Sequence, residues 1–437
     1  MIDATTNGSP QDRVDQRRTS PSVDRVLTVD RDIVDDPYPV WAALRAECPV
    51  YREPVHDVVV VTRYDDIVDV ARRTKDFSSV LAAYGPNGGD RGPTPGQLCA
   101  IARDGAAYPG EVRDVLDAYR PDLQDQLQHV DPPMHTEHRR IVSRWFTPNV
   151  ISQRESSVRA IAREMIERID PNGPVEMLDA FAGPFPATVV ADAIGIPVEH
   201  RDVFLDWKEE IIGNPEAEAS RVASERYRTI RAIFLSLIHE RRAEPRNDMI
   251  STLAGIAELD DAAVLGLLML FLGGGQETTA KAITSGIRIL AERPELQASL
   301  GADPGRIAGF VEELVRFDNP VRGIFRQAVR DTSIGGVAVP EGSLVQIMWA
   351  SGNRDESVFD DADAFDPERV MPRPILSFGH GIHLCAGAPL ARLQLRVGFE
   401  ELLARYRFTL AADNPFTYFR SQILRGLAGL WIELEPA

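Results

Sequence analysis

The sequence is poor in lysine, cysteine and net positive charge. Three of its 48 basic residues are lysines, Lys75, Lys208 and Lys281. We attribute this bias to coding composition rather than to function. The net charge of −18 argues against nucleic acid or an anionic membrane as the main partner. Three cysteines, an odd number without a CxxC pair, exclude a disulfide framework and do not suggest zinc.

Long apolar runs are also missing. The longest, residues 262–272, is too short to span a bilayer, and the polar N-terminus lacks the apolar core of a signal peptide. We therefore expect a cytoplasmic protein without a membrane segment. With 437 residues, 44% of them hydrophobic, the chain is long enough to bury a large core.

The pattern along the chain predicts one mainly α-helical domain with small β-sheets. Residues 1–25 are polar and predict a disordered leader, and 26–437 predict the single domain. The run Val58–Val61 predicts a buried strand, and 260–290 a helix roughly 45 Å long. The stretch 81–110 is rich in glycine and proline, and a loop of that length is usually functional or mobile.

One short segment suits a metal-bound thiolate. Residues 378–387 read FGHGIHLCAG, and a helical pattern follows. A thiolate ligand needs close backbone approach, which Gly381 and Gly387 permit, and a helix N-terminus that stabilises negative sulfur. Phe378 can shield the sulfur of Cys385 from water. The alternative is a buried structural cysteine, which is the usual fate of a lone one.

This segment resembles the haem-binding loop of the cytochrome P-450 superfamily, F-x-x-G-x-[H/R]-x-C-x-G, at every defined position. The resemblance implies haem b with Cys385 as the axial ligand of its iron. It also implies that Phe378, His383 and Gly387 belong to the cofactor site. The implied fold is that of the family, over about residues 35–437.

The long predicted helix contains GGGQETT at residues 273–279. Three glycines inside a helix cost about 1 kcal/mol each against alanine, and a groove for something flat or small explains them. The stretch resembles the family's [A/G]-G-x-[D/E]-T. There Gly274 lies against the cofactor, Thr278 steadies bound oxygen and Glu277 helps to deliver protons. The alternative is a bend that serves only packing.

Glu313 and Arg316 are three residues apart on one predicted helix face. Alone they could be an ordinary surface pair. They resemble the family's E-x-x-R, and residues 365–369 resemble its F-x-P-x-R segment. The resemblance implies that Arg369 completes a buried structural cluster with both residues.

Three further residues match the family's propionate ligands. His135 and Arg139 lie one turn apart on a predicted helix that begins near Asp131, which we expect to cap it. Arg326 resembles the arginine that binds the other propionate, and His383 joins it. Histidine and arginine donors suit carboxylates.

The resemblance implies a monooxygenase that uses O2 and takes electrons from outside. No dinucleotide-binding fingerprint is present, so NAD(P)H acts only indirectly, through ferredoxin reductase and ferredoxin. Docking of an acidic ferredoxin needs a basic patch. Its candidates, which could also be ordinary solvated arginines, are Arg140, Arg144, Arg392 and Arg396.

The substrate is expected to be a small, largely apolar organic molecule. By resemblance, its pocket is lined by the 81–110 loop and by Leu270, Gly274, Val321, Arg322, Ile324 and Ile423. If the chain after Pro320 is extended, Arg322 shares a face with Arg326 and could meet a carboxylate or carbonyl on the substrate. Otherwise Arg322 points to solvent or to a propionate.

Two other readings stay open. A peroxide-driven peroxygenase would need no ferredoxin, but such relatives tend to lose the acid–alcohol pair that this sequence keeps as Glu277 and Thr278. A haem-binding module without turnover is the third possibility, and the same pair argues weakly against it.

Overall fold

The computed structural model describes residues 23–28, 30–54, 56–79, 127–205, 225–412, 414 and 416–437. The 81–110 loop and nearly all of the expected leader lie outside these ranges. Val23–Arg25 is the exception, because it forms the 3-10 helix η2. Val23 is buried in one cluster with Leu27 and Trp41, so ordered structure begins before the predicted boundary at residue 25.

The prediction of a mainly α-helical fold with small sheets is confirmed. The longer helices are α2 (Tyr38–Glu47), α8 (Glu155–Glu167), α9 (Pro184–Ile194), α12 (Glu225–Ala243), α14 (Asp261–Ala291), α16 (Ile307–Phe317) and α18 (Ala388–Arg405). Shorter helices are α1 (Arg31–Asp35), α3 (Tyr64–Arg72), α6 (Met134–Val142), α7 (Pro148–Gln153), α10 (Arg201–Leu205), α13 (Met249–Ala254), α15 (Pro294–Ala302) and α17 (Trp349–Gly352). Single turns are η4 (Leu127–His129), η5 (Ser143–Phe146), η7 (Val198–His200), η8 (Pro304–Arg306) and η9 (Gly381–His383), with a π-helix, η6 (Leu178–Ala182).

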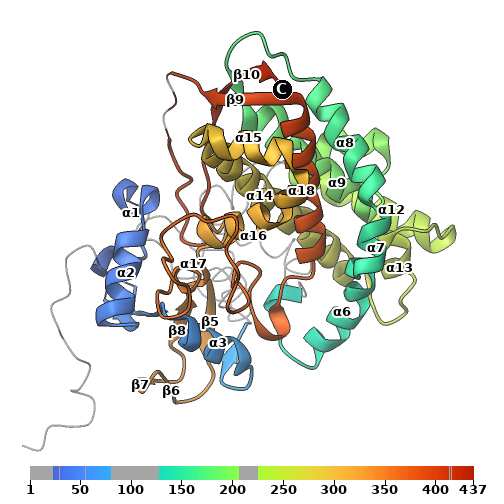
Figure 1. The fold of residues 1–437 in the computed structure, drawn as a ribbon. Helices are drawn as coiled ribbons and strands as arrows, with labels where there is room; N and C mark the ends of the chain where they lie inside the picture. The colour runs from blue at the N-terminus through green and yellow to red at the C-terminus, as the bar shows by residue number, and fades with distance from the viewer. Residues whose placement is uncertain are drawn as a thin grey trace, which may run out of the picture.

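The long predicted helix is α14, whose 31 residues run through the middle of the molecule (Figure 1). It begins where the Asp260 carboxylate accepts a hydrogen bond from the Ala263 N–H at 2.8 Å. It ends before Pro294, which starts α15. Gly286 lets α18 pack closely, because a Cβ there would lie 2.3 Å from the Phe399 ring.

Within the described ranges, three small sheets complete the fold. The largest has the strand order β1-β2-β8-β5-β3, and β2 and β8 in it are parallel. The expected strand Val58–Val61 is confirmed as β2, and all four of its residues are buried. The other strands are β1 (Val50–Glu53), β3 (Phe77–Ser78), β4 (Val175–Glu176), β5 (Ile324–Ala328), β6 (Thr332–Ile334), β7 (Val337–Val339), β8 (Leu344–Ile347), β9 (Tyr406–Leu410) and β10 (Trp431–Pro436).

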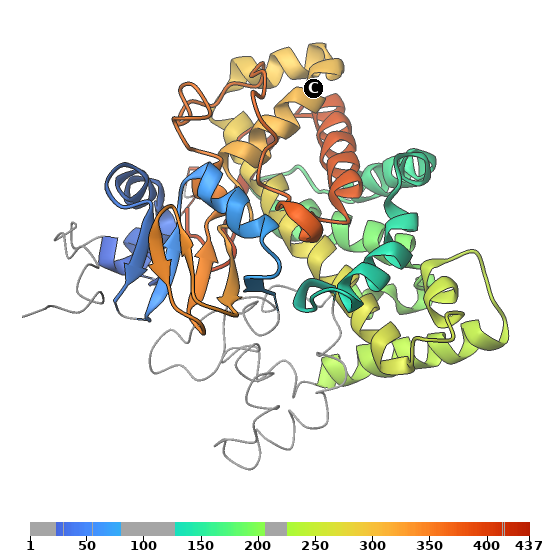
Figure 2. The same cartoon turned by 90° about the horizontal axis from the view of Figure 1, so that it is seen from below.

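The part of the molecule that contains the large sheet and the part that is mostly helical lie on opposite sides of α14. The five-stranded sheet and α2 are on one side, and α6 to α9, α12 and α13 are on the other (Figures 1 and 2). The turn η9 lies between α3 and α6 in both views. The expected cysteine loop therefore lies where both sides of the molecule meet. In the described ranges, no helix is both long enough and apolar enough to cross a bilayer.

Candidate active site

The cysteine loop is closed by its own backbone. The N–H of Cys385 donates to the carbonyl of Phe378 at 2.8 Å, around η9. Gly381 has a φ of 74°, and a Cβ there would lie 2.6 Å from the carbonyl oxygen of Ala71. Only glycine fits where the loop meets α3 in this way. The helix expected after Cys385 is confirmed as α18, which begins at Ala388.

The surroundings of the Cys385 sulfur act on its charge in two directions. The residue is accessible within the site, yet protein atoms surround the sulfur, and this desolvation raises the pKa of the thiol. Hydrogen bonds from the N–H groups of Gly387 and Ala388 lower that pKa, as do the charges of Arg139 and Arg392. Amide and guanidinium groups are what a thiolate needs beside it once a metal cation is bound.

The four predicted propionate residues come together beside the loop. The ring centroids of His135 and His383 are 4.3 Å apart, and Nε2 of His135 is buried without a hydrogen-bond partner in the described residues. Burial and the charge of Arg326 lower the pKa of His383 to about 2. Burial also lowers the pKa of Arg326 to about 10 and, in direction, that of Arg139. This cluster favours a ligand that brings negative charge.

Three residues join this cluster that the sequence analysis did not assign to it. Oγ of Ser79 lies 2.8 Å from Nε2 of His383. Asp131 is not a cap, because α6 begins only at Met134 and the carboxylate accepts from the N–H of Ser79 at 2.9 Å. His129 is buried near Arg326, and burial lowers its pKa to about 3. Ser79 follows a two-residue strand and carried no signal, whereas His129 was visible as a histidine close before the propionate helix.

The middle of α14 presents an accessible stripe at a spacing of four residues: Leu270, Gly274 and Thr278. Oγ1 of Thr278 donates to the carbonyl of Gly274 at 3.0 Å. No described atom lies within 4 Å of where a Cβ on Gly274 would be, so the helix is open there. Gly275 has a different use, because its Cβ would lie 2.7 Å from a methyl group of Val190 on α9.

Glu277 pairs with a lysine of the same helix. Its Oε1 lies 3.0 Å from Nζ of Lys281, one turn later, and its Oε2 is buried without a partner in the described residues. Apart from their spacing of four residues, nothing in the sequence suggests this pair.

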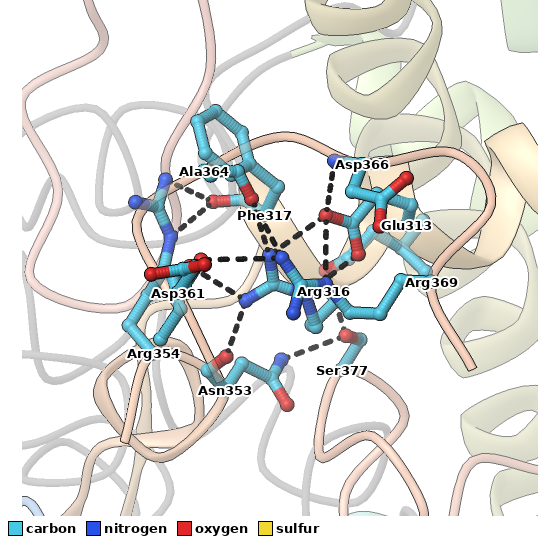
Figure 3. Close-up of polar contacts among 12 residues, drawn as sticks. Glu313, Arg316, Phe317, Asn353, Arg354, Asp361, Ala364, Asp366, Arg369 and Ser377 are labelled. Atoms are coloured by element: carbon cyan, nitrogen blue, oxygen red, sulfur yellow. Dashed lines mark hydrogen bonds and ion pairs between the residues drawn. The ribbon is translucent and has the colours of Figure 1, made fainter. Parts of the chain in front are cut away.

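Glu313, Arg316 and Arg369 form one buried cluster (Figure 3). Arg316 makes two hydrogen bonds to the Glu313 carboxylate, at 2.7 and 2.8 Å, and neither side chain is exposed to solvent. Nε of Arg369 reaches Oε1 of Glu313 at 3.3 Å. Three carbonyl groups accept from the remaining N–H groups of Arg316: those of Asn353, Ala362 and Ala364.

Two residues connect this cluster to the cysteine loop. The Asn353 side chain accepts from the N–H of Leu376 at 2.6 Å and donates to Oγ of Ser377 at 2.8 Å. Ser377, which lies beside Asn353 in Figure 3, in turn donates to the carbonyl of Val315 on α16 at 2.7 Å. The chain immediately before Phe378 is thus fastened to the buried cluster.

Part of the expected substrate wall is assembled. Val321 pairs with Leu424 in an isolated bridge, which brings Ile423 beside it. Ile324 and Val321 both pack against the core beneath the large sheet, and both stay partly accessible.

The expectation that Arg322 shares a face with Arg326 is wrong. The strand begins only at Ile324, and Gly323 interrupts the alternation where a Cβ would lie 2.5 Å from the carbonyl oxygen of Ile347. The Arg322 guanidinium instead lies 5.4 Å from the Trp41 ring and donates to the Ser421 carbonyl at 2.9 Å. With 2% of its surface exposed, Arg322 is buried on the α2 side of the sheet.

The four arginines proposed for docking are not equivalent. Arg392 pairs with Glu312 and lies over the Phe378 ring, 4.2 Å from its centroid. Arg396 pairs with Glu155 at 2.7 Å and with Glu400 at 2.9 Å, which fastens α18 to α8. Arg140 and Arg144 are exposed, with no ion pair in the described part of the chain. Exposed Arg72 on α3, which the sequence did not single out, donates to Nε2 of His380 in the cysteine loop at 2.9 Å.

Together these residues fit a flat, dianionic metal porphyrin. The buried cations and the unpartnered Nε2 of His135 match two carboxylates. The open backbone at Gly274 leaves room for a planar ring or a small ligand. The Cys385 sulfur, which accepts two backbone hydrogen bonds, matches a thiolate ligand.

Known proteins share this sequence and architecture. A family model described as cytochrome P450 matches residues 307–426. Cytochrome P450 130 of Mycobacterium tuberculosis is 34% identical over 383 residues, which cover 85% of this chain and 88% of the relative. Linalool 8-monooxygenase of Pseudomonas putida is 34% identical over 413 residues, or 92% and 96% of the two chains.

Solved structures agree. Cytochrome P450 CYP109Q5 from Chondromyces apiculatus superposes with a TM-score of 0.79 at 29% identity and covers 94% of this chain and 98% of its own. The substrate-free form of cytochrome P450 CYP150A6 from Mycobacterium marinum also gives 0.79, at 29% identity, with 95% and 100% covered. The chain therefore belongs to the cytochrome P450 family and is a monooxygenase, an enzyme class that uses haem and O2.

Proposed function

We propose that the protein is a soluble, cytoplasmic haem-thiolate monooxygenase in which residues 26–437 form one domain. It inserts one oxygen atom of O2 into a C–H or C=C bond of a small, largely apolar substrate. The observation that carries the assignment of the site is the Cys385 loop beside a buried cluster of cations. No described carboxylate except Asp131 lies near that cluster. Bound haem b supplies oxygen activation at its iron.

The residues of this chain hold and orient the cofactor. Cys385 would supply the thiolate ligand of the iron, and the N–H groups of Gly387 and Ala388 would stabilise its charge. His135, Arg139, Arg326 and His383 donate hydrogen bonds or charge to the two propionates, and Ser79 fixes the His383 ring. Phe378 and the Arg392 side chain stacked on it limit the access of water to the sulfur.

Two residues of α14 take part in proton transfer. The Thr278 hydroxyl, which donates to the carbonyl of Gly274, lies at the open part of the helix, where its oxygen would accept and pass on a proton. Glu277 supplies a proton from the next position along the chain. The peroxygenase alternative has no use for this pair, and that favours the O2-dependent reaction.

Electrons come from ferredoxin, which ferredoxin reductase reduces with NAD(P)H. The exposed arginines around the cysteine loop, Arg72, Arg140 and Arg144, suit an acidic partner on the thiolate side. Arg392 and Arg396 contribute less, because carboxylates of this chain already neutralise them.

The substrate pocket is largely apolar. Leu270, Gly274, Val321, Ile324 and Ile423 line it, and Arg322 is left out because its guanidinium packs on Trp41. The relatives include proteins named linalool 8-monooxygenase, vitamin D(3) 25-hydroxylase and erythromycin C-12 hydroxylase, but the pocket proposed here is made of apolar residues. This composition favours recognition by shape over recognition by charge.

Reconstitution tests the proposal. Haem-loaded protein should show the ferrous carbonyl spectrum of a thiolate ligand. It should oxidise a compound found by spin-state screening when NADH, ferredoxin reductase and ferredoxin are supplied. Thr278→Ala should keep oxidising NADH but release more peroxide and less product. Turnover with peroxide alone, and none with ferredoxin, would favour the peroxygenase, and no turnover with either would favour a binding module.

A further inference from the structure

Lys281 is buried beside the acid of the proposed proton pathway. It is one of three lysines in the chain, and 3% of its surface is exposed. Its Nζ lies 3.0 Å from Oε1 of Glu277, whose side chain is 11% exposed. Glutamate followed by lysine four residues later is the favourable order for a pair on one helix. Water does not screen this pair as it would a surface pair.

Two contacts from the C-terminal part of the chain hold the lysine in place. Its Nζ lies 3.7 Å from the centroid of the Phe419 ring, the geometry of a cation–π interaction. Gly426 leaves room for the aliphatic stem, because a Cβ there would lie 2.4 Å from Cγ of Lys281. The ammonium is therefore enclosed between α14 and the turn that carries Ile423.

The two carboxylate oxygens of Glu277 therefore differ in their surroundings. The ammonium engages Oε1, whereas Oε2 is buried and has no partner in the described residues. A buried carboxylate without a cation would be costly, so the lysine makes an ionised acid tolerable at this position. The free oxygen can take up a proton from water and then pass it on, while the ammonium stabilises the carboxylate that remains.

We infer that Lys281 is a positioning residue that holds Glu277 by one oxygen and leaves the other for proton transfer. The inference rests on the proposed role of Glu277 in the monooxygenase. The competing role is a purely structural ion pair that fastens α14 to the 419–426 turn.

A double-mutant cycle separates the two roles. The full-length, haem-loaded variants are Lys281→Met, Lys281→Arg, Glu277→Gln and the double variant Lys281→Met/Glu277→Gln. Peroxide released per NADH oxidised is measured with ferredoxin and its reductase and without organic substrate, so that no unidentified compound is needed. Lys281→Met should raise this ratio and slow NADH oxidation on the order of tenfold. Lys281→Arg keeps the charge and should stay closer to wild type.

If Lys281 acts through Glu277, its removal should have no further effect once Glu277 is glutamine. Additive effects, or equal effects of methionine and arginine, would overturn the inference. Exposed Lys75 provides a matched control, because Lys75→Met should change nothing. Gly426→Ala is a second route if Lys281→Met does not fold, since it displaces the lysine stem and keeps both charges. It should raise peroxide release in the same direction.

Infrared difference spectroscopy supplies a readout that needs no turnover. Lys281→Met should show a protonated carboxyl band that is lost in the double variant, because a buried carboxylate without its cation takes up a proton. Absence of that band would also overturn the inference. A wild-type protein that shows no ferredoxin-driven oxygen reduction would instead contradict the proposed function, and the infrared result would still report on the pair.

Discussion

Two buried groups of charges in this protein differ in how completely they are neutralised. Around Glu313, the two arginines meet a carboxylate and several carbonyl groups. Around Arg326, cations and histidines gather with Asp131 as the one carboxylate near them in the described residues. A satisfied cluster holds the fold together, whereas one that lacks negative charge is built for a ligand that brings it. Neutralisation thus separates structural charges from binding charges.

Breaking the satisfied cluster should have the largest effect. Glu313→Gln leaves two buried guanidinium groups without their anion, and we expect a loss of about 3–5 kcal/mol in the free energy of unfolding. The measurement is urea denaturation. The control is Glu368→Gln, which breaks the exposed pair with Arg306 and should cost less than about 1 kcal/mol. Similar losses in both variants would remove the distinction.

Removal of a charge from the cluster around Arg326 should weaken the binding of haem rather than the fold. Arg326→Met removes a cation that is buried without a paired carboxylate, so the cofactor-free protein should unfold within about 1 kcal/mol of wild type or be more stable. Its affinity for haem should fall about 10- to 100-fold, because one charged hydrogen bond to a propionate is lost. Haem transfer to apomyoglobin measures that affinity. Arg316→Met should destabilise the protein with and without haem.

His129, beside Arg326 in the unsatisfied cluster, should make the stability of the protein depend on pH. Burial lowers the pKa of His129 to about 3 from an ordinary value of 6.5. Between these two pKa values the unfolded chain binds a proton at this histidine and the folded chain does not. The stability present above about pH 6.5 is therefore lost as the pH falls. The slope for this histidine is about 1.4 kcal/mol per pH unit between pH 6 and pH 4. His129→Gln should flatten the slope of the cofactor-free protein by that amount, and an unchanged slope would contradict this.

Exposed arginines should have the smallest effect on stability. Arg140→Gln and Arg144→Gln should change the free energy of unfolding by no more than about 0.5 kcal/mol. The KM for ferredoxin should rise about threefold and more steeply at low salt, since these charges act at long range. Arg396→Gln is the matched comparison and should raise that KM less, because Glu155 and Glu400 neutralise it. Steady-state kinetics at two ionic strengths would show whether the order holds.

The sequence predicted what depends on local pattern. The fold class, the long helix α14, the strand Val58–Val61 and the helix after Cys385 follow from periodicity and from glycine positions close together in the chain, whereas the cap expected at Asp131 was wrong. The family motifs extended this to residues far apart, such as Arg326 and His383.

Prediction from the sequence failed where a contact between residues far apart in the chain determines the position of a side chain. Gly323 meets the carbonyl of Ile347, and this turns Arg322 to the other side of the sheet. A carboxylate on α8 neutralises Arg396, and one on α16 neutralises Arg392. No local sequence pattern predicts these pairs. Ser79 lies about fifty residues before the propionate helix and is brought to it only by the fold.

The side chain of Asn353 has a consequence for how the protein inactivates on heating. It joins the segment before the sulfur ligand to the same carbonyl network that receives Arg316. Melting of that network would release the ligand loop at once, so pigment and helical content should vanish at one temperature during heating.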